Sequence, residues 1–226
     1  MRVLRGRAAT PEADAEATAE LLARTGETGE PGLRVWRPHR QVAFGRRDAN
    51  AEGYEGARRA AGERGFEPVE RSVGGRAVAY TGTTLAVAHA RPIDDIRQGL
   101  DERYDEAVDQ LRAALGRLGV DAEPGEPPNS FCPGTHSLQA EDRKIAGVAQ
   151  RVKQEAALVA SVVMVDERSE IADVLAPVYG ALGVPFDPET VGSVADAGGP
   201  DDPETVARAI EDAVIGSREA TIERIS

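Results

Sequence analysis

The chain has 226 residues and a formal net charge of −12, so it can form one large domain or two small ones with an acidic surface. That charge argues against nucleic acid as the main partner, because phosphate binding needs a basic face. No apolar run approaches the roughly 20 residues that cross a bilayer, and the N-terminus does not resemble a signal peptide, so we expect a cytoplasmic protein without a membrane partner.

The first half of the chain alternates helical and strand patterns. A helix is expected after Thr10, which can cap it, with Pro11 at the first helical position and Gly26 at its end. Strands at residues 33–36 and 41–45 are close enough in sequence to form a hairpin or a neighbouring pair. A helix, a strand and a second, alternating strand are then expected at residues 51–64, 66–69 and 84–90.

The second half begins with a helix at residues 101–118, whose apolar residues recur at helical spacing. Residues 121–134 are rich in proline and have no apolar period, which predicts a linker or an active-site loop. Strands are expected at residues 144–150 and 157–165. The last quarter is expected to be helical, with a helix that Pro177 either kinks or delays.

Several of these strands are near enough in sequence to pair as hairpins. This favours an α+β fold with a mixed, largely antiparallel sheet over a doubly wound parallel sheet. We expect a single domain over residues 1–226, with a short helical extension from about residue 196.

Two residue types are scarce enough to be informative. Cys132 is the only cysteine, which excludes an internal disulfide and leaves a thiol that is either buried or reactive. Lysine occurs only at Lys144 and Lys153, while arginine supplies nearly all the positive charge. An acidic chain that is poor in lysine and rich in alanine is typical of a protein adapted to high salt, where charge repulsion is screened.

A glycine turn lies between the strand at residues 66–69 and the alternating strand. Gly74 and Gly75 allow positive φ and a close approach of backbone to a ligand, and we expect Gly75 to need that freedom. Arg71 and Arg76 place two guanidinium groups beside the turn, which suits a carboxylate or a phosphate. We expect both arginines to be largely solvated and to contribute little to folding. The alternative is a simple hairpin turn.

Three segments, in order and at matching spacing, resemble the catalytic domain of the lipoate–protein ligase, octanoyltransferase and biotin ligase superfamily. The first is similar to an entry pair of strands, one bearing a tryptophan and the next ending in Gly-Arg. The second is similar to an arginine-glycine loop, and the third to a Lys-x-x-Gly-x-Ala-x-Arg strand. In this chain they are Leu33-Arg34-Val35-Trp36 with Val42-Ala43-Phe44-Gly45-Arg46, Arg71-Ser72-Val73-Gly74-Gly75-Arg76-Ala77-Val78, and Lys144-Ile145-Ala146-Gly147-Val148-Ala149-Gln150-Arg151.

The resemblance implies an octanoyl or lipoyl chain in an apolar slot beneath the glycine turn. Lys144 would hold the acyl carbonyl oxygen or an acyl-adenylate phosphate, since an ammonium stabilises negative charge that develops during acyl transfer. The alternative for Lys144 is a surface lysine at a strand end. The substrate-binding residues implied by position are Arg71, Gly74, Gly75, Arg76, Tyr80, Gly147 and Ala149.

The chain departs from the ligase pattern at Glu70, Arg76 and the pair Tyr80-Thr81. The larger side chain at position 76 leaves less room for a nucleotide, and the loop resembles more closely the cysteine-dependent octanoyltransferases and lipoyl amidotransferases. In those enzymes a cysteine shortly before the lysine strand carries the acyl group as a thioester, and Cys132 stands in that place. The alternative is that Cys132 is a small buried apolar residue.

Histidine is the other candidate for proton transfer. His136 is close to Cys132 in sequence and could act as a base, although sequence neighbours need not be spatial neighbours. His39 and His89 fall on none of the three segments and are expected to be structural.

We therefore expect an acyltransferase that uses Cys132 and Lys144 and requires no cofactor. Its partners would be a lipoyl carrier domain or a glycine cleavage H-type protein, with an octanoyl or lipoyl substrate. Two alternatives stay open: an ATP- and magnesium-dependent lipoate–protein ligase, and a non-catalytic relative that binds the acyl chain or the carrier. The short region after Ser193 favours the transferase, because the ligases have an additional C-terminal domain, unless a separate chain supplies it.

Overall fold

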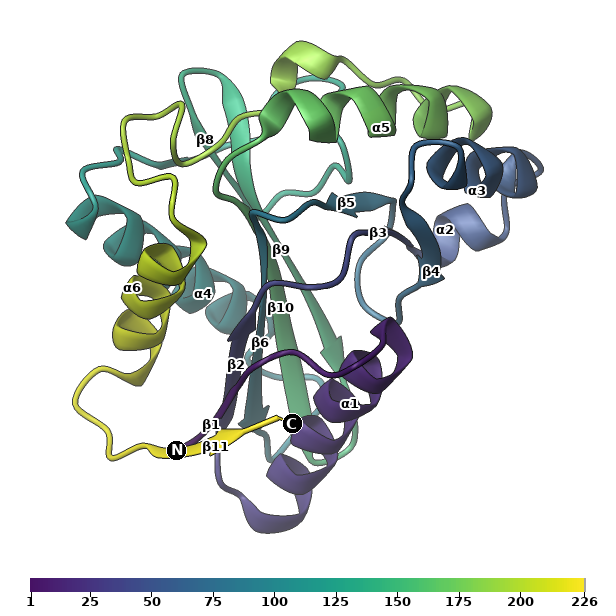
Figure 1. Ribbon diagram of the computed structural model, residues 1–226. Coiled ribbons are helices and arrows are strands. Elements are labelled where there is room, and N and C mark those ends of the chain that lie inside the picture. The colour runs from purple at the N-terminus through teal and green to yellow at the C-terminus, as the bar shows by residue number, and fades with distance from the viewer. Residues whose placement is uncertain (226) are drawn as a thin grey trace.

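Alternating apolar side chains build an eight-stranded mixed sheet in the computed structural model, which describes residues 1–225 (Figure 1). Its strand order is β11-β1-β2-β6-β10-β9-β8-β7, parallel among the first three strands and antiparallel from β2 onward. The expected α+β fold with a mixed, largely antiparallel sheet is therefore confirmed. The strands are β1 (Arg2–Arg5), β2 (Gly32–Trp36), β6 (Thr84–Pro92), β7 (Glu123–Pro124), β8 (Ser137–Ala140), β9 (Arg143–Val152), β10 (Ala156–Met164) and β11 (Thr221–Arg224).

A second, three-stranded sheet holds the glycine turn. Its order is β4-β3-β5, with β3 (Gln41–Phe44) parallel to β4 (Glu67–Glu70) and antiparallel to β5 (Val78–Tyr80). The expected pairing of the strands at residues 33–36 and 41–45 is wrong. Both edges of β2 are occupied, by β1 and β6, so the chain leaves the large sheet at Pro38 and starts the second sheet instead.

Six α-helices cover the sheets in Figure 1. α1 lies on one face of the large sheet, while α4 and α6 pack together on the other. α3 packs on α5 beside the small sheet. The helices are α1 (Pro11–Thr28), α2 (Arg46–Ala49), α3 (Tyr54–Gly62), α4 (Leu100–Arg117), α5 (Arg168–Ala181) and α6 (Pro203–Ile215), with one 3₁₀ turn, η1 (Pro188–Thr190).

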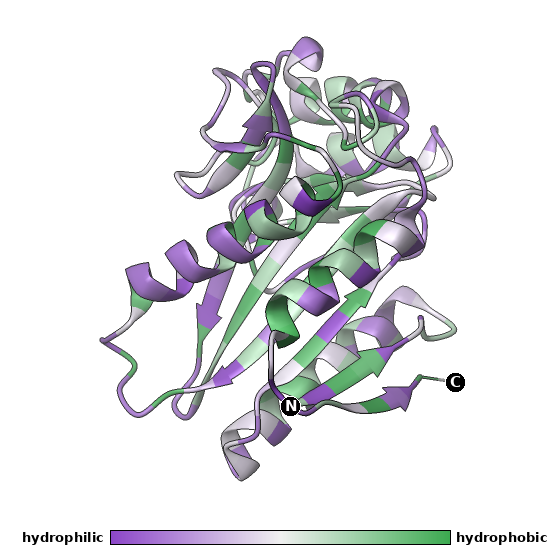
Figure 2. Ribbon diagram, turned by 90° about the vertical axis from the view of Figure 1, so that its left-hand side faces the viewer, coloured by the Kyte–Doolittle hydropathy of each residue, from purple (hydrophilic) through white to green (hydrophobic). Residues whose placement is uncertain are grey.

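The two faces of the large sheet follow the two-residue period of its strands. On β6, Leu85 and Val87 join the core beneath α4 and α6, whereas Ala88 and Ala90 pack toward Leu21 of α1. Figure 2 shows hydrophobic residues along the strands, and helices that carry hydrophobic and hydrophilic residues, as expected for helices with one buried face. The face that α1 covers is lined by small residues, and this is the face that matters for the site.

Most expected elements are present, and a few differ from the expectation. The cap of α1 is confirmed, since the Thr10 hydroxyl accepts a hydrogen bond from the Ala13 N–H at 3.2 Å. The helix expected at residues 51–64 is the shorter α3, and the one-turn helix α2 before it was not expected. Helix α5 begins at Arg168 and contains Pro177, so the proline does not delay its start. The short strands β1, β8 and β11 were not expected, because four residues are too few to show a clear apolar alternation.

The region after residue 196 is not only helical. It contains α6, whose apolar face belongs to the core of the large sheet, and β11, which pairs with β1. No helix within residues 1–225 is both long and apolar enough to cross a membrane.

Acid should destabilise the fold through His89. Its side chain is 4% exposed on β6, and burial, together with the charges of Arg91 and Arg218, lowers the pKa of His89 to about 3. Between pH 6.5 and pH 3 the unfolded chain binds a proton that the folded chain cannot, so stability falls by about 1.4 kcal/mol per pH unit from this group. Urea unfolding at pH 7 and pH 5 should show a loss about 2 kcal/mol larger in the wild type than in His89→Leu. Equal losses would mean that His89 does not control acid stability.

Candidate active site

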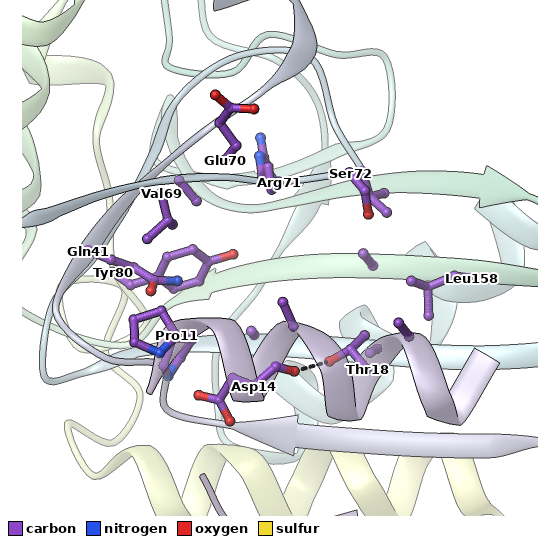
Figure 3. Close-up of a pocket in the computed structure, with 18 of the residues that line it drawn as sticks. Pro11, Asp14, Thr18, Gln41, Val69, Glu70, Arg71, Ser72, Tyr80 and Leu158 are labelled. Carbon is purple, nitrogen blue, oxygen red and sulfur yellow. Dashed lines mark hydrogen bonds between the residues drawn. The ribbon is translucent and has the colours of Figure 1, made fainter. Parts of the chain in front are cut away.

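A slot of about 660 Å³ lies between α1, the central strands and the loop that joins β4 to β5. We call residues 71–77 the glycine loop. Figure 3 shows this loop above the slot, α1 below it, and the Tyr80 hydroxyl pointing into the space between them. The slot is open to a chain-like ligand because its floor is built from alanine, at Ala86, Ala88 and Ala160. Its remaining walls include Pro11, Ala15, Leu22, Trp36, Val69, Val73 and Leu158, so an alkyl chain would meet mostly apolar surface.

The glycine loop is tied closely to the end of β3. A Cβ atom on Gly45 would lie 2.4 Å from the carbonyl oxygen of Gly75, so only glycine allows this approach. Positive φ is found at Gly74 (+92°), and the expectation that Gly75 needs it is wrong. A Cβ on Gly74 would lie 2.7 Å from the guanidinium carbon of Arg71, whereas a Cβ on Gly75 would meet only the Arg47 side chain at 3.8 Å.

Replacing Gly74 with Ala should therefore displace Arg71 and slow the reaction of Cys132 with iodoacetamide by about tenfold at neutral pH, because the thiol loses its nearest cation. Gly75→Ala is the matched control, since the added methyl group makes only an ordinary van der Waals contact with the Arg47 side chain and Gly75 has no positive φ. Alkylation followed by intact mass gives both rates. Equal rates in the two variants would show that the glycine loop does not position Arg71.

The two arginines of the glycine loop contact buried groups, and the expectation that they are largely solvated is wrong. One Arg71 nitrogen donates to the Arg76 carbonyl oxygen at 2.6 Å and to the Cys132 sulfur at 3.1 Å. Arg76 forms an ion pair at 3.1 Å with Asp48, which is fully buried. Removing Arg76 would leave a buried carboxylate without its partner, which costs several kcal/mol rather than less than one.

Cys132 lies on the segment between β7 and β8, residues 125–136, which we call the cysteine loop. Its backbone is left-handed, with φ +42°, and its N–H donates to the Tyr179 hydroxyl at 2.6 Å. That hydroxyl donates in turn to the Ala77 carbonyl oxygen at 2.9 Å, which links the cysteine loop to the glycine loop through α5. The thiol is half-buried and faces Arg71.

The surroundings of Cys132 favour its thiolate. Burial by itself would raise the pKa of the Cys132 thiol, but Arg71 and Lys144 and the backbone N–H groups of Arg76 and Gly75 together lower it below its ordinary value. In general, cations and backbone donors around a thiol increase its thiolate fraction and so its reactivity. Arg71 also lines the slot, so the sulfur is one side chain away from the space that would hold an alkyl chain.

Lys144 is 1% exposed on β9 and lies beneath the cysteine loop. Its ammonium donates to both carboxylate oxygens of Glu126 at 3.0 Å, and to the carbonyl oxygens of Phe131 at 3.0 Å and Cys132 at 2.9 Å. Burial lowers the pKa of Lys144, although the carboxylate of Glu126 opposes this shift. The lysine is therefore not at the surface, and it joins the site through the backbone of Cys132.

The other predicted substrate-binding residues differ in whether they line the slot. Tyr80, like Arg71, lines the slot, whereas Gly147 and Ala149 lie on β9 outside it. A Cβ on Gly147 would lie 3.3 Å from the Lys144 Cε, so this glycine leaves space for the lysine. His136 stacks on the Tyr104 ring, with centroids 3.8 Å apart.

Three contributors were missed from the sequence. Glu126 sits in the proline-rich segment, Tyr179 lies 47 residues beyond Cys132, and Asp48 belongs to a one-turn helix. None of them follows a local pattern that would mark it. The one sequence feature that could have indicated Glu126 is its place as the acidic residue between Pro124 and Pro127 in a proline-rich loop. This feature is too weak to predict a role.

Solved structures share the fold over the whole chain. A lipoate-protein ligase A bound with ATP superposes with a TM-score of 0.80 at 20% identity, covering 100% of this chain and 89% of the other. A putative lipoate protein ligase from T. acidophilum with bound lipoic acid gives 0.75 at 21% identity, covering 100% and 89%. These likenesses establish a common fold.

Comparison of sequences gives the family. An octanoyl-[GcvH]:protein N-octanoyltransferase from Kyrpidia tusciae is 39% identical over 82 residues, a match that covers 36% of this chain and 28% of the relative's length. The family model described as the lipoyl protein ligase A/B catalytic domain matches residues 11–214, which include the slot, the glycine loop, Cys132 and Lys144. The chain therefore belongs to the lipoyl protein ligase A/B catalytic domain family.

Proposed function

We propose that this protein transfers an octanoyl or lipoyl group to a lysine of a lipoyl carrier domain, through a thioester on Cys132. The observation that carries the proposal is the contact of the Cys132 sulfur with Arg71, at 3.1 Å, where Arg71 also lines an apolar slot of about 660 Å³. A thiol whose pKa is lowered beside a slot for an alkyl chain is the arrangement that acyl transfer requires.

In the first half-reaction the Cys132 thiolate attacks the acyl carbonyl carbon of the donor. A sulfur–carbon bond forms, the bond from carbon to the donor nitrogen or sulfur breaks, and the donor amine or thiol departs with a proton. The alkyl chain lies over the alanine floor of the slot. Arg71 and the backbone N–H groups of Gly75 and Arg76, which face the sulfur, stabilise the negative charge that develops on the carbonyl oxygen.

In the second half-reaction the amine of a carrier lysine attacks the thioester carbon. A carbon–nitrogen bond forms, the carbon–sulfur bond breaks, and Cys132 leaves as a thiolate while the amine proton passes to solvent. The same cations that lower the pKa of Cys132 make its sulfur a good leaving group. No side chain is assigned as the base, because the His136 ring is stacked on Tyr104.

The carrier proteins are proposed from the relatives. The Kyrpidia tusciae relative is named for transfer of an octanoyl group from GcvH to a protein, and one bipartite ligase from Thermoplasma acidophilum is described together with its E2 lipoyl domain. We propose the same two kinds of partner here: a glycine cleavage H-type protein as the donor, and an E2-type lipoyl domain as the acceptor.

The ATP-dependent alternative fits the residues less well. There, Lys144 would face the phosphate of an acyl-adenylate. Its ammonium is already held by the carboxylate of Glu126 at 3.0 Å, and a phosphate at that place would be repelled by the same carboxylate. We therefore propose a reaction that needs neither ATP nor magnesium, and we assign no step to them.

The test is transfer between two purified carriers. Octanoylated H-type protein and an unmodified lipoyl domain are mixed with the protein, with and without ATP and magnesium, and the intact mass of the lipoyl domain is followed. An octanoyl mass gain without ATP supports the proposal. A gain that needs free octanoate with ATP supports the ligase, and binding of the carrier without any gain supports a non-catalytic relative.

A further inference from the structure

The ammonium of Lys144 faces more acceptors than it has protons. It has three N–H groups and four oxygen atoms within 3.0 Å, two from Glu126 and one each from Phe131 and Cys132. The carbonyl groups are neutral, so Glu126 supplies the single negative charge among these acceptors. An ammonium that is 1% exposed would lose its proton readily without such a partner, because burial disfavours the charged form.

Glu126 is itself held in place. The hydroxyl of Ser130, which is fully buried, donates a hydrogen bond to the same carboxylate that binds Lys144. The Glu126 side chain is 22% exposed, so it keeps contact with solvent while Lys144 does not. Glu126 and Ser130 both belong to the first half of the cysteine loop, and the ion pair therefore ties this half of the loop to β9.

We propose that Glu126 is the counterion that keeps Lys144 protonated and directed at the backbone of Cys132. Glu126 is in this sense a positioning residue, which acts through Lys144. The charged or titratable groups that act on Lys144 are Glu126, Cys132 and Arg71. Of these, Glu126 is the one that favours the ammonium at a pH where Cys132 is still a thiol.

The consequence for Cys132 follows from the two carbonyl contacts. Lys144 binds the carbonyl oxygens of the two successive peptide groups that flank the Cys132 Cα, so it holds Cys132 in its left-handed conformation. Its positive charge also helps to lower the pKa of the Cys132 thiol. If Lys144 became neutral, both effects would weaken together. The role of Glu126 in transfer rests on the proposed function, whereas its effect on Lys144 does not.

The small number of lysines makes a direct test possible. With ¹³C at the lysine Cε, the protein gives two signals, from Lys144 and Lys153, and Lys144→Arg assigns them. The Lys144 shift is followed against pH in the wild type and in Glu126→Gln, which keeps a hydrogen-bonding side chain without the charge. The midpoint of Lys144 should fall by about one to three pH units in the variant, while exposed Lys153 serves as the internal reference.

Two further variants separate charge from structure. Glu126→Asp restores the carboxylate and should return the Lys144 midpoint most of the way to the wild-type value. Glu123→Gln removes an exposed carboxylate on β7, just before the cysteine loop, and should leave the midpoint unchanged. A Lys144 midpoint that is equal in Glu126→Gln and in the wild type, with both proteins folded, would overturn the proposal.

The catalytic arm uses single-turnover acylation of Cys132 by an octanoyl thioester between pH 6 and pH 10. In Glu126→Gln the rate should decline at high pH, beginning about one to three units lower than in the wild type, and Glu126→Asp should restore the profile. If the wild type is not acylated at all, the proposed function fails, while the lysine titration still decides the role of Glu126.

Discussion

Cys132→Ala should form no acyl-enzyme and should lose transfer activity by on the order of 10⁴-fold or more, because the nucleophile is removed and no other thiol exists in the chain. Mixing the wild type with an octanoyl thioester, without an acceptor, should leave one octanoyl group on the protein. Hydroxylamine should release it, as it does from thioesters. Intact mass measured before and after hydroxylamine gives the result for both proteins.

Cys132→Ser is the matched control for this loss. The hydroxyl preserves the size of the side chain and a hydrogen-bonding atom near Arg71, yet its far higher pKa leaves it a poor nucleophile. Both variants should keep the wild-type melting temperature within the few degrees that a half-buried methyl-sized change causes. Near-normal transfer by Cys132→Ala in a reaction that requires ATP would contradict the thioester mechanism and favour the ligase.

Lys144→Ala should slow both half-reactions by roughly tenfold to a hundredfold, because Cys132 loses a cation that lowers its pKa and the ammonium that holds its backbone. It should also destabilise the fold by about 3 kcal/mol, because Glu126 and two peptide carbonyl groups lose their partner inside the protein. Rapid-quench acylation and deacylation give the two rates, and urea unfolding gives the stability. The coupled loss distinguishes Lys144 from Cys132, whose removal affects chemistry alone.

Arg143→Ala is the matched control for Lys144→Ala. Arg143 is the preceding residue on β9, and successive side chains on a strand point to opposite faces. Its removal changes the net charge by the same amount without touching the cysteine loop, so both half-reactions should keep their rates. An equal slowing in Arg143→Ala and Lys144→Ala would mean that the effect comes from net charge rather than from the contacts of Lys144.

The fold was largely predictable because its strands and helices have clear periods. Long elements such as β6, β10, α1 and α4 carry enough apolar residues at spacing two or 3.6 to be predicted from the sequence. The pairing of β2 and β3 was not predictable in this way. Whether two adjacent strands pair depends on which edges are already occupied, and the edges of β2 are taken by β1 and by β6, which lies about 50 residues further along.

The glycine loop likewise has features that the sequence predicted and features that depend on the tertiary structure. Its sequence indicated a bare backbone flanked by cations, and the structure contains one. The sequence pattern could not assign the positive φ to Gly74 rather than Gly75, or direct Arg71 toward a thiol 61 residues away. Both depend on how the loop lies against Gly45, and that contact exists only once the small sheet has formed.

The sequence by itself determined the family, the mixed sheet, and the two residues, Cys132 and Lys144, whose rarity marked them as candidates. Local pattern and composition carry that information, because the period of apolar residues, the position of glycines and the rarity of a residue type can all be read along the chain. The tertiary structure alone decided which charges meet. Arg71 faces Cys132, Arg76 pairs with Asp48, and Glu126 holds Lys144, since burial brings together groups from separate elements and an ion out of water needs a partner.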